Sequence, residues 1–191
     1  GQSHLVGENK IIRRMVDAKM LSSMILYGPP GIGKTSIASA IAGSTHSAFR
    51  QLNAATDTKK DLQIVVEEAK FSGQVILLLD EVHRLDKPKQ DFLLPHLESG
   101  QDILIGATTE NPSFEVNSAL LSRAQVYVLK ALTDPEMLLL LERARKHGLG
   151  HLEFDEVAVA TLIGYADGDA RRFLNLLEQT RTSAETSGIT R

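Results

Sequence analysis

The chain has 191 residues, 42% hydrophobic and 24% charged, an ordinary globular composition that allows one large domain or two small ones. The absence of cysteine excludes disulfides and thiolate metal sites, and no run suits a membrane span or a targeting signal, so we expect a cytoplasmic protein without a membrane partner. The formal net charge is −3, and because dedicated DNA-binding domains are usually basic, any nucleic-acid contact must be local or lie outside this sequence.

The first predicted element is a short apolar strand, Met24–Tyr27, that leads into a glycine-rich segment. This segment, Gly28–Thr35, fits the phosphate-loop pattern G-x-x-x-x-G-K-[ST]. Glycines let the backbone curl so that its N–H groups face phosphate oxygens, and a helix expected from Lys34 to about Ala42 presents its N-terminus to the same anion. The pattern predicts that Lys34 reaches the β and γ phosphates and that the Thr35 hydroxyl ligates Mg²⁺.

Further along the chain, short apolar runs alternate with helical patterns. The third run, Val75–Leu79, is continuously apolar, as expected of a parallel strand buried on both faces. Strands that alternate with helices predict an α/β fold with a parallel sheet and crossover helices. The runs expected to form this sheet are Met24–Tyr27, Ala48–Leu52, Val75–Leu79, Ile103–Ala107 and Val126–Leu129.

Two acidic residues, Asp80 and Glu81, close the third run. Residues at the carboxyl end of a strand in a parallel sheet face the ligand crevice. Asp80 can hold Mg²⁺ there, directly or through water, and Glu81 can polarise an attacking water. An acidic pair that merely ends a strand is the alternative, but the apolar run before it and the phosphate loop favour the functional interpretation.

Polar residues also follow the fourth and second runs. Thr109 could hydrogen-bond the γ-phosphate or the attacking water, and Asn53 is polar at the same edge of the expected sheet. A threonine that ends a strand and an asparagine that forms a turn are ordinary alternatives. The residues themselves favour neither interpretation.

Several basic residues need separate interpretations. Arg123 follows a short helical stretch and could stabilise the charge that develops during triphosphate hydrolysis, although a solvated surface arginine is the simpler interpretation of the pattern. A basic cluster beside the predicted site is interpreted as a solvated face; it contains His83, Arg84, Lys87 and Lys89. The histidines show no metal-ligand spacing, so no metal is assigned to them.

From residue 131 onward the pattern is helical only, which predicts an α/β domain over residues 1–130 and a small helical domain over residues 131–191. Thr133 and Glu136 fit a capping box, and the helix that they open is expected to end at Gly148.

Two further helices are expected in this second domain. Asp155 can cap the first of them, and Gly168-Asp169 precedes the last. Arg171, at the start of the last helix, could reach phosphates and would make the helical domain a lid, whereas a solvated charge is the alternative.

Taken together, these positions resemble an AAA+ ATPase, and more specifically the replication-associated recombination protein A family, also called MgsA, which is related to the clamp loaders. Gly28–Thr35 resembles Walker A, Leu77–Arg84 resembles Walker B with its extension, and Gly106–Pro112 resembles sensor 1. The other matches are Leu121–Arg123 with the arginine-finger motif, Gly168–Arg172 with sensor 2, His4–Gly7 with the segment that lines the adenine pocket, and Leu52–Ala54 with the strand-two motif of clamp loaders. The resemblance covers essentially the whole chain.

The resemblance implies a five-stranded sheet ordered 5-1-4-3-2 with helices on both faces, a small all-α lid domain, and ATP bound between subunits. Arg123 would then act on a neighbour's nucleotide and Arg171 on its own. The implied catalytic residues are Glu81, Lys34, Arg123, Thr109 and Asn53. The implied nucleotide-binding residues are Leu5, Val6, Gly28, Pro29, Pro30, Gly31, Ile32, Gly33, Lys34, Thr35, Ser36 and Arg171, and the implied Mg²⁺ ligands are Thr35 and Asp80.

The implied activity is Mg²⁺-requiring, DNA-dependent hydrolysis of ATP to ADP and phosphate by a motor of DNA replication and recombination maintenance at stalled forks. The implied partners are DNA with forks, gaps or ends, further copies of the full-length protein, and single-stranded-DNA-binding protein, in a bacterial cytoplasm and associated with the nucleoid. Family members carry more chain, including the part associated with oligomer assembly, so we expect this sequence to be a fragment. Two alternatives stay open: a motor of the Holliday-junction branch-migration type, and a non-catalytic assembly module that depends on nucleotide.

Overall fold

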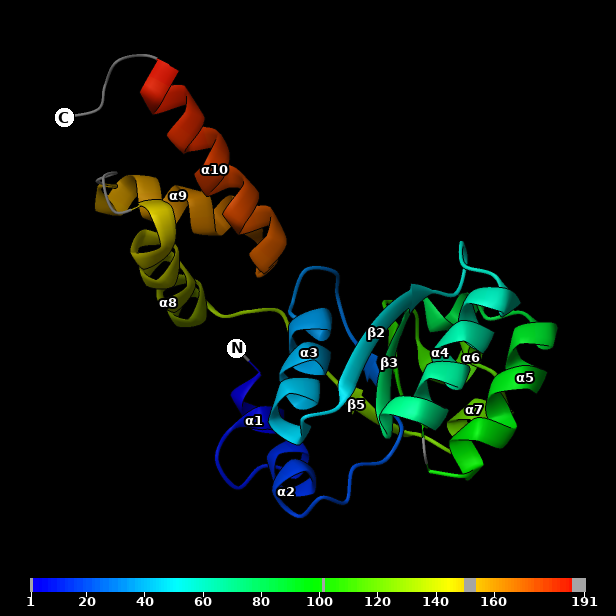
Figure 1. The fold of residues 1–191 in the computed structure, drawn as a ribbon. Helices are drawn as coiled ribbons and strands as arrows, with labels where there is room; N and C mark the ends of the chain where they lie inside the picture. The colour runs from blue at the N-terminus through cyan, green and yellow to red at the C-terminus, as the bar shows by residue number, and fades with distance from the viewer. Residues whose placement is uncertain (1, 101, 150–153, 187–191) are drawn as a thin grey trace. The chain divides into compact units, whose positions relative to one another are not determined.

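The computed structural model describes residues 2–100, 102–149 and 154–186, which fall into two compact units (Figure 1). One unit comprises Gln2–Gly28 and Lys34–Leu129. The other contains the chain from Lys130 onward together with the loop segment Pro29–Gly33. Among the described residues, no helix is both long enough and apolar enough to cross a membrane.

The first unit is built on a five-stranded sheet in the order β2-β3-β4-β1-β5, and all of its neighbouring strands are parallel. This is the predicted order read from the other edge, so the predicted α/β fold and strand order are confirmed. The strands are β1 (Met24–Tyr27), β2 (Ala48–Asn53), β3 (Val75–Asp80), β4 (Asp102–Thr108) and β5 (Gln125–Val128). Each strand begins and ends within one residue of its predicted run.

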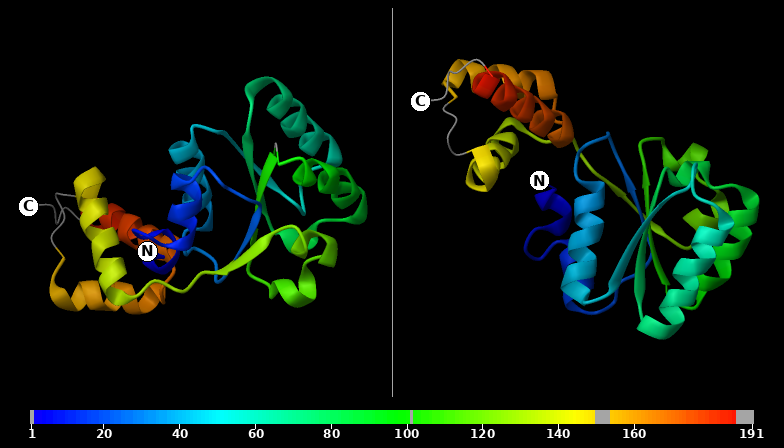
Figure 2. Two further views of the ribbon diagram at one scale, coloured as in Figure 1. Left: turned by 90° about the horizontal axis from the view of Figure 1, so that it is seen from below. Right: turned by 45° about the horizontal axis from the view of Figure 1, so that its top comes forward.

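Helices cover both faces of this sheet (Figure 2). One face carries α3 (Lys34–Thr45), which packs against the central strands and against α2 (Ile11–Asp17). The other face carries α4 (Lys59–Ser72) and α5 (Lys87–Glu98). The shorter helical elements are α1 (Ser3–Val6), η1 (Val82–Arg84), α6 (Pro112–Glu115) and α7 (Ser118–Leu121).

The core of this unit lies where β3 and β4 are covered on both sides. Val75–Leu79 is at most 3% exposed at every position, which is why a continuous apolar run, rather than an alternating one, forms this strand. The side chains of Leu62, Val65 and Ala69 on α4 pack into the same cluster. Because every strand is parallel, the carboxyl ends of the strands and the residues that follow them gather at one edge of the sheet.

The second unit contains helices α8 (Asp134–Ala144), η2 (Arg145–Leu149), α9 (Glu156–Ala166) and α10 (Ala170–Thr186). These helices begin where their caps predict: Thr133 and Glu136 form the capping box, and Asp155 Oδ1 accepts a hydrogen bond of 2.6 Å from the Ala158 N–H. Gly148 has a φ of 139° inside the irregular turn that follows α8.

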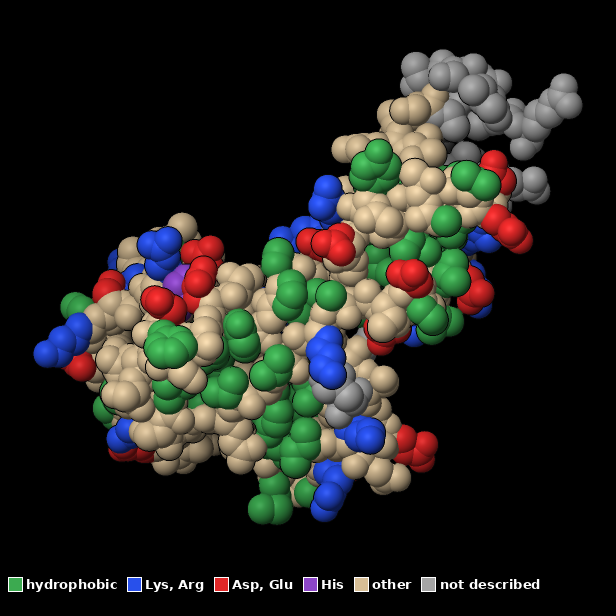
Figure 3. Space-filling view, turned by 180° about the vertical axis from the view of Figure 1, so that it is seen from behind, with side chains coloured by type: hydrophobic (Ala, Val, Ile, Leu, Met, Phe, Trp, Pro, Cys, Tyr) green, Lys and Arg blue, Asp and Glu red, His purple; other side chains and the backbone are tan. Residues whose placement is uncertain are grey.

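A separate apolar core holds α8, α9 and α10 together; it contains Met137, Leu141, Ile163, Ala166, Phe173 and Leu177. Phe173 and Leu177, four residues apart on one side of α10, are fully buried. This unit also leaves apolar side chains at its surface, among them Leu138, Leu139 and Val157, and hydrophobic side chains are visible on its face in Figure 3.

Candidate nucleotide-binding site

The phosphate loop begins directly after β1 at the carboxyl edge of the sheet. The Gly28 N–H donates a 3.2 Å hydrogen bond to the Thr108 carbonyl at the end of β4, which anchors the start of the loop to the neighbouring strand. At the other end of the loop, Lys34 opens α3, and its Nζ donates a 2.7 Å hydrogen bond to the Gly28 carbonyl. This bond joins the two residues that flank the loop, Gly28 and Lys34.

Two glycines in the loop have backbone conformations that other residues rarely adopt. The φ values are 68° at Gly31 and 103° at Gly33. A Cβ added to Gly31 would also lie 1.7 Å from Oδ1 of Asp169, in the same compact unit. Asp169 Oδ1 accepts a 2.9 Å hydrogen bond from the Arg172 N–H, and the Ala170 N–H donates one of 2.9 Å to the Gly31 carbonyl. Gly31 is thus confined by both its conformation and its contacts.

Replacing either loop glycine by alanine is expected to weaken nucleotide binding, since each substitution strains the loop by about 1–3 kcal/mol. Gly31→Ala should have the larger effect because its Cβ must also displace the Asp169 carboxylate, whereas nothing lies within 4 Å of a Cβ at Gly33. Titration with a fluorescent ATP analogue and thermal unfolding would measure both effects.

Gly43→Ala is the matched control for these two variants. Gly43 lies within α3, and a Cβ there would meet no atom within 4 Å. Alanine in a helix interior stabilises relative to glycine by roughly 0.5–1 kcal/mol, so this variant should retain nucleotide affinity. Equal affinity in all three variants would contradict the role given to the loop.

The predicted acidic pair lies at the same edge. Asp80 is the last residue of β3, and its Oδ2 accepts a 2.8 Å hydrogen bond from Nε2 of Gln51 on β2. Glu81 is exposed and has a left-handed backbone with a φ of 51°, which is uncommon for a residue other than glycine. Strained conformations of this kind concentrate at functional sites, and here the strain falls on the residue expected to orient water.

The end of β4 carries a contact that the sequence did not reveal. Thr108 is buried, and its Oγ1 lies 2.9 Å from Nδ1 of His83 in the segment after the acidic pair. The same oxygen accepts a 3.0 Å hydrogen bond from the Glu110 N–H. These bonds fix the turn that carries Thr109, whose side chain is exposed. The segments that follow β3 and β4 are therefore joined through His83 and Thr108.

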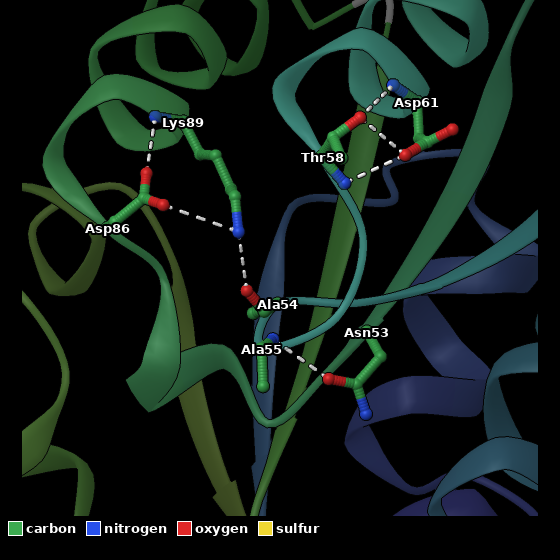
Figure 4. A network of polar contacts seen from close by, with 7 residues as sticks. All are labelled: Asn53, Ala54, Ala55, Thr58, Asp61, Asp86 and Lys89. Carbon is green, nitrogen blue, oxygen red and sulfur yellow. Dashed lines mark hydrogen bonds and ion pairs between the residues drawn. The ribbon is translucent and has the colours of Figure 1, made fainter.

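Asn53 ends β2, where it pairs in register with Asp80 of β3. Its Oδ1 accepts a 2.8 Å hydrogen bond from the Ala55 N–H, so this oxygen forms a turn at the start of the loop before α4 (Figure 4). The turn-forming alternative is present in the structure, and the position at the carboxyl edge is also as predicted. The catalytic role assigned to Asn53 stays a prediction.

The interpretation of the basic cluster as a solvated face is wrong for two of its members. His83 bonds to Thr108, and Lys89 donates a 2.7 Å hydrogen bond through Nζ to the Ala54 carbonyl (Figure 4). The Lys89 side chain is only 12% exposed and lies 3.4 Å from the Asp86 carboxylate. Arg84 and Lys87 are exposed, as predicted. Charge spacing alone could not distinguish these cases, because the contacts come from β4 and from the loop after β2.

Arg123 lies at the opposite edge of the sheet from the phosphate loop. It follows α7 and precedes β5, whose first residue, Gln125, pairs with Met24 at the start of β1. The four residues of β1 span about 13 Å and separate this position from the start of the loop. Arg123 is held there by Glu98 at the end of α5, to which its Nε donates a 2.8 Å hydrogen bond.

The other predicted binding residues lie in separate elements. Leu5 is buried and Val6 half-buried, both in α1. Thr35 is half-buried and Ser36 exposed, both in the first turn of α3. Arg171 is exposed in the first turn of α10, which belongs to the second unit. The carboxyl edge of the sheet therefore brings together the loop ends, the acidic pair, Asn53 and the Thr108–Thr109 turn.

Asp102 and Asp86, two carboxyl groups that are not among the predicted site residues, have shifted pKa values. Burial raises the pKa of Asp102, which is at the amino end of β4. The Lys89 backbone N–H, which donates to the carboxylate that caps α5, lowers the pKa of Asp86.

No group of three or more His, Cys, Asp or Glu side chains suited to a metal ion occurs among the described residues. Mg²⁺ is usually held by one or two protein groups together with phosphates and water, and Thr35 with Asp80 offers oxygen ligands of that kind.

Comparison with known proteins identifies relatives of this chain. A replication-associated recombination protein A from Bacillus subtilis is 58% identical over 192 residues, which cover 98% of this chain and 46% of that protein. The protein of the same name from Coxiella burnetii is 49% identical over 185 residues, which cover 93% of this chain and 42% of that protein. The chain thus spans less than half the length of these two relatives.

The solved structure of the Thermotoga maritima RuvB Holliday junction branch migration motor aligns with a TM-score of 0.79 at 24% identity, over 93% of this chain and 60% of that one. This likeness supports the fold alone. The sequence model of the family named ATPase family associated with various cellular activities (AAA) matches residues 24–132. The resemblance to replication-associated recombination protein A is therefore confirmed, and the chain belongs to the AAA family of ATPases.

Proposed function

We propose that this chain is the ATP-binding and ATP-hydrolysing part of a motor that maintains DNA replication and recombination at stalled forks. The observation that carries the proposal is the phosphate loop after β1 with the acidic pair Asp80-Glu81 at the same edge of the sheet. The relatives named replication-associated recombination protein A supply the biological setting.

In this proposal each residue at the carboxyl edge has a distinct task. The backbone N–H groups of the loop and the Lys34 ammonium bind the β and γ phosphates. Thr35 and Asp80 would hold Mg²⁺, Asp80 mainly through water, and the ion would offset the charge that develops on the transferred phosphoryl group. Glu81 orients the attacking water. Thr109 and Asn53 complete the surroundings of the γ-phosphate.

We assign residues 1–130 to the nucleotide-binding domain and residues 131–191 to a helical lid. Arg171 would contact the phosphates of its own subunit, and Leu5 and Val6 would line the adenine pocket. Closure of the lid would convert the nucleotide state into motion.

The arginine finger would act between subunits. Arg123 precedes β5, at the amino edge of the sheet, while the phosphate loop follows β1 at the carboxyl edge, so Arg123 is badly placed to reach the nucleotide of its own subunit. This favours a homo-oligomer in which Arg123 contacts a neighbour's γ-phosphate. DNA and single-stranded-DNA-binding protein are the proposed further partners, and a nucleoid-associated position in the bacterial cytoplasm is the proposed location.

The test is steady-state ATP turnover of the full-length protein with forked, gapped and blunt-ended DNA and with a four-way junction. The proposal expects Mg²⁺-dependent turnover that forks, gaps or ends stimulate most. Stimulation that is greatest with the four-way junction would instead favour a branch-migration motor. Nucleotide binding without turnover on any DNA would favour the assembly module.

A further inference from the structure

The Arg123 guanidinium is engaged on all of its nitrogens within its own subunit. Nε and Nη2 both donate to Glu98 Oε1. Nη1 donates to the Ala119 carbonyl at 2.9 Å and to the Ser122 hydroxyl at 3.1 Å. A guanidinium has five N–H groups. With four of these directed at its own chain, Arg123 has at most one left for a phosphate.

An arginine that stabilises a phosphoryl group does so best with two parallel N–H groups. Arg123 cannot present such a pair while Glu98 holds its Nε and one Nη. The Glu98 carboxylate also offsets the positive charge that a neighbour's γ-phosphate would attract. A paired contact with a phosphate through Nε and Nη2 therefore excludes the contact with Glu98, and the two anions compete for one side chain.

The ion pair between Glu98 and Arg123 is exposed enough to break easily. Glu98 is the last residue of α5, and its side chain is 56% exposed, while that of Arg123 is 35% exposed. Ion pairs with this exposure contribute little to stability, because water and salt screen them. A neighbour's phosphate can therefore displace Glu98 without disturbing the core of the sheet.

We propose that Glu98 holds Arg123 in a resting position and so lowers ATP turnover. This restraint ends when the guanidinium binds the nucleotide of a neighbouring subunit. Glu98 is a positioning residue here, since it acts only through Arg123. The inference rests on the proposed function, because it assumes that Arg123 acts on a neighbour's ATP.

The test compares full-length Glu98→Gln and Glu98→Ala with the unchanged protein in ATP turnover without DNA. The restraint predicts that kcat rises about two- to fivefold in both variants, the range over which an exposed ion pair biases an equilibrium, while KM for ATP stays the same. Glu67→Gln, an exposed acidic residue on α4, is the matched control and should leave kcat unchanged.

A double variant separates this inference from the proposed function. Glu98→Gln combined with Arg123→Ala should turn over ATP no faster than Arg123→Ala alone, since Glu98 acts only through Arg123. If the unchanged protein hydrolyses ATP and Arg123→Ala removes that activity, an unchanged or lower kcat in both Glu98 variants overturns the restraint and leaves the proposed function standing. If Arg123→Ala has no effect on turnover, the proposed role of Arg123 fails first.

Discussion

Replacing Glu81 by glutamine in the full-length protein is expected to lower ATP turnover about 10²–10⁴-fold while leaving ATP binding intact. Glutamine has nearly the same shape as glutamate but cannot polarise a water by accepting its proton. The phosphate loop and Lys34, which we expect to supply most of the phosphate contacts, are unchanged by this substitution. The loss should therefore appear in kcat rather than in the affinity for ATP.

Single-turnover hydrolysis and titration with a fluorescent ATP analogue would measure the two quantities separately. Glu67→Gln is again the matched control, because it makes the same chemical change at an exposed position on α4. Glu81 itself has a left-handed φ of 51°, so thermal unfolding of the variant should be compared with that of the unchanged protein. Turnover within a factor of two of the unchanged protein would remove Glu81 from the mechanism.

Replacing Arg123 by alanine is expected to lower turnover by about 10³–10⁵, the range found for arginine fingers. The position of Arg123 also predicts which subunit loses activity. Because it lies at the opposite edge of the sheet from the loop of its own subunit, its loss in one subunit should inactivate the site of a neighbour.

Mixing two inactive proteins tests this expectation. The Arg123→Ala protein retains Glu81, and the Glu81→Gln protein retains Arg123. If the finger acts between subunits, a mixed oligomer contains some sites with both groups, and turnover should recover to a readily measured fraction of the unchanged activity. If Arg123 acts within its own subunit, every site in the mixture lacks one group, and no recovery will be seen at any mixing ratio.

Much of the fold was predictable because burial dictates its pattern directly. A strand covered on both faces must be apolar at every position, and Val75–Leu79 shows that pattern in the sequence. The helix starts at Thr133 and Asp155 were likewise readable, since a capping side chain bonds to backbone only two or three residues away. The strand order was predicted from the family resemblance, because apolar runs in the sequence do not indicate which strands are neighbours in the sheet.

The side-chain partners within the site were not predictable, because they join residues far apart in the sequence. Nothing near His83 indicates that Thr108 will bond to it, and nothing near Lys89 indicates the Ala54 carbonyl. The pairing of Arg123 with Glu98 is of the same kind. Each contact depends on how α5, α7 and the strand ends pack, so spacing along the chain could indicate only a generic charged surface.

The proposed mechanism requires a triphosphate to bind to the backbone between β1 and α3 with the acidic pair facing it. The most direct measurement is a crystal structure of the full-length protein with Mg²⁺ and a non-hydrolysable ATP analogue. We expect the β and γ phosphates within hydrogen-bonding distance of the loop N–H groups and of Lys34 Nζ, with the Asp80 carboxylate directed at the metal. A saturating analogue bound elsewhere, or Asp80 and Glu81 turned away from the phosphates, would contradict the account.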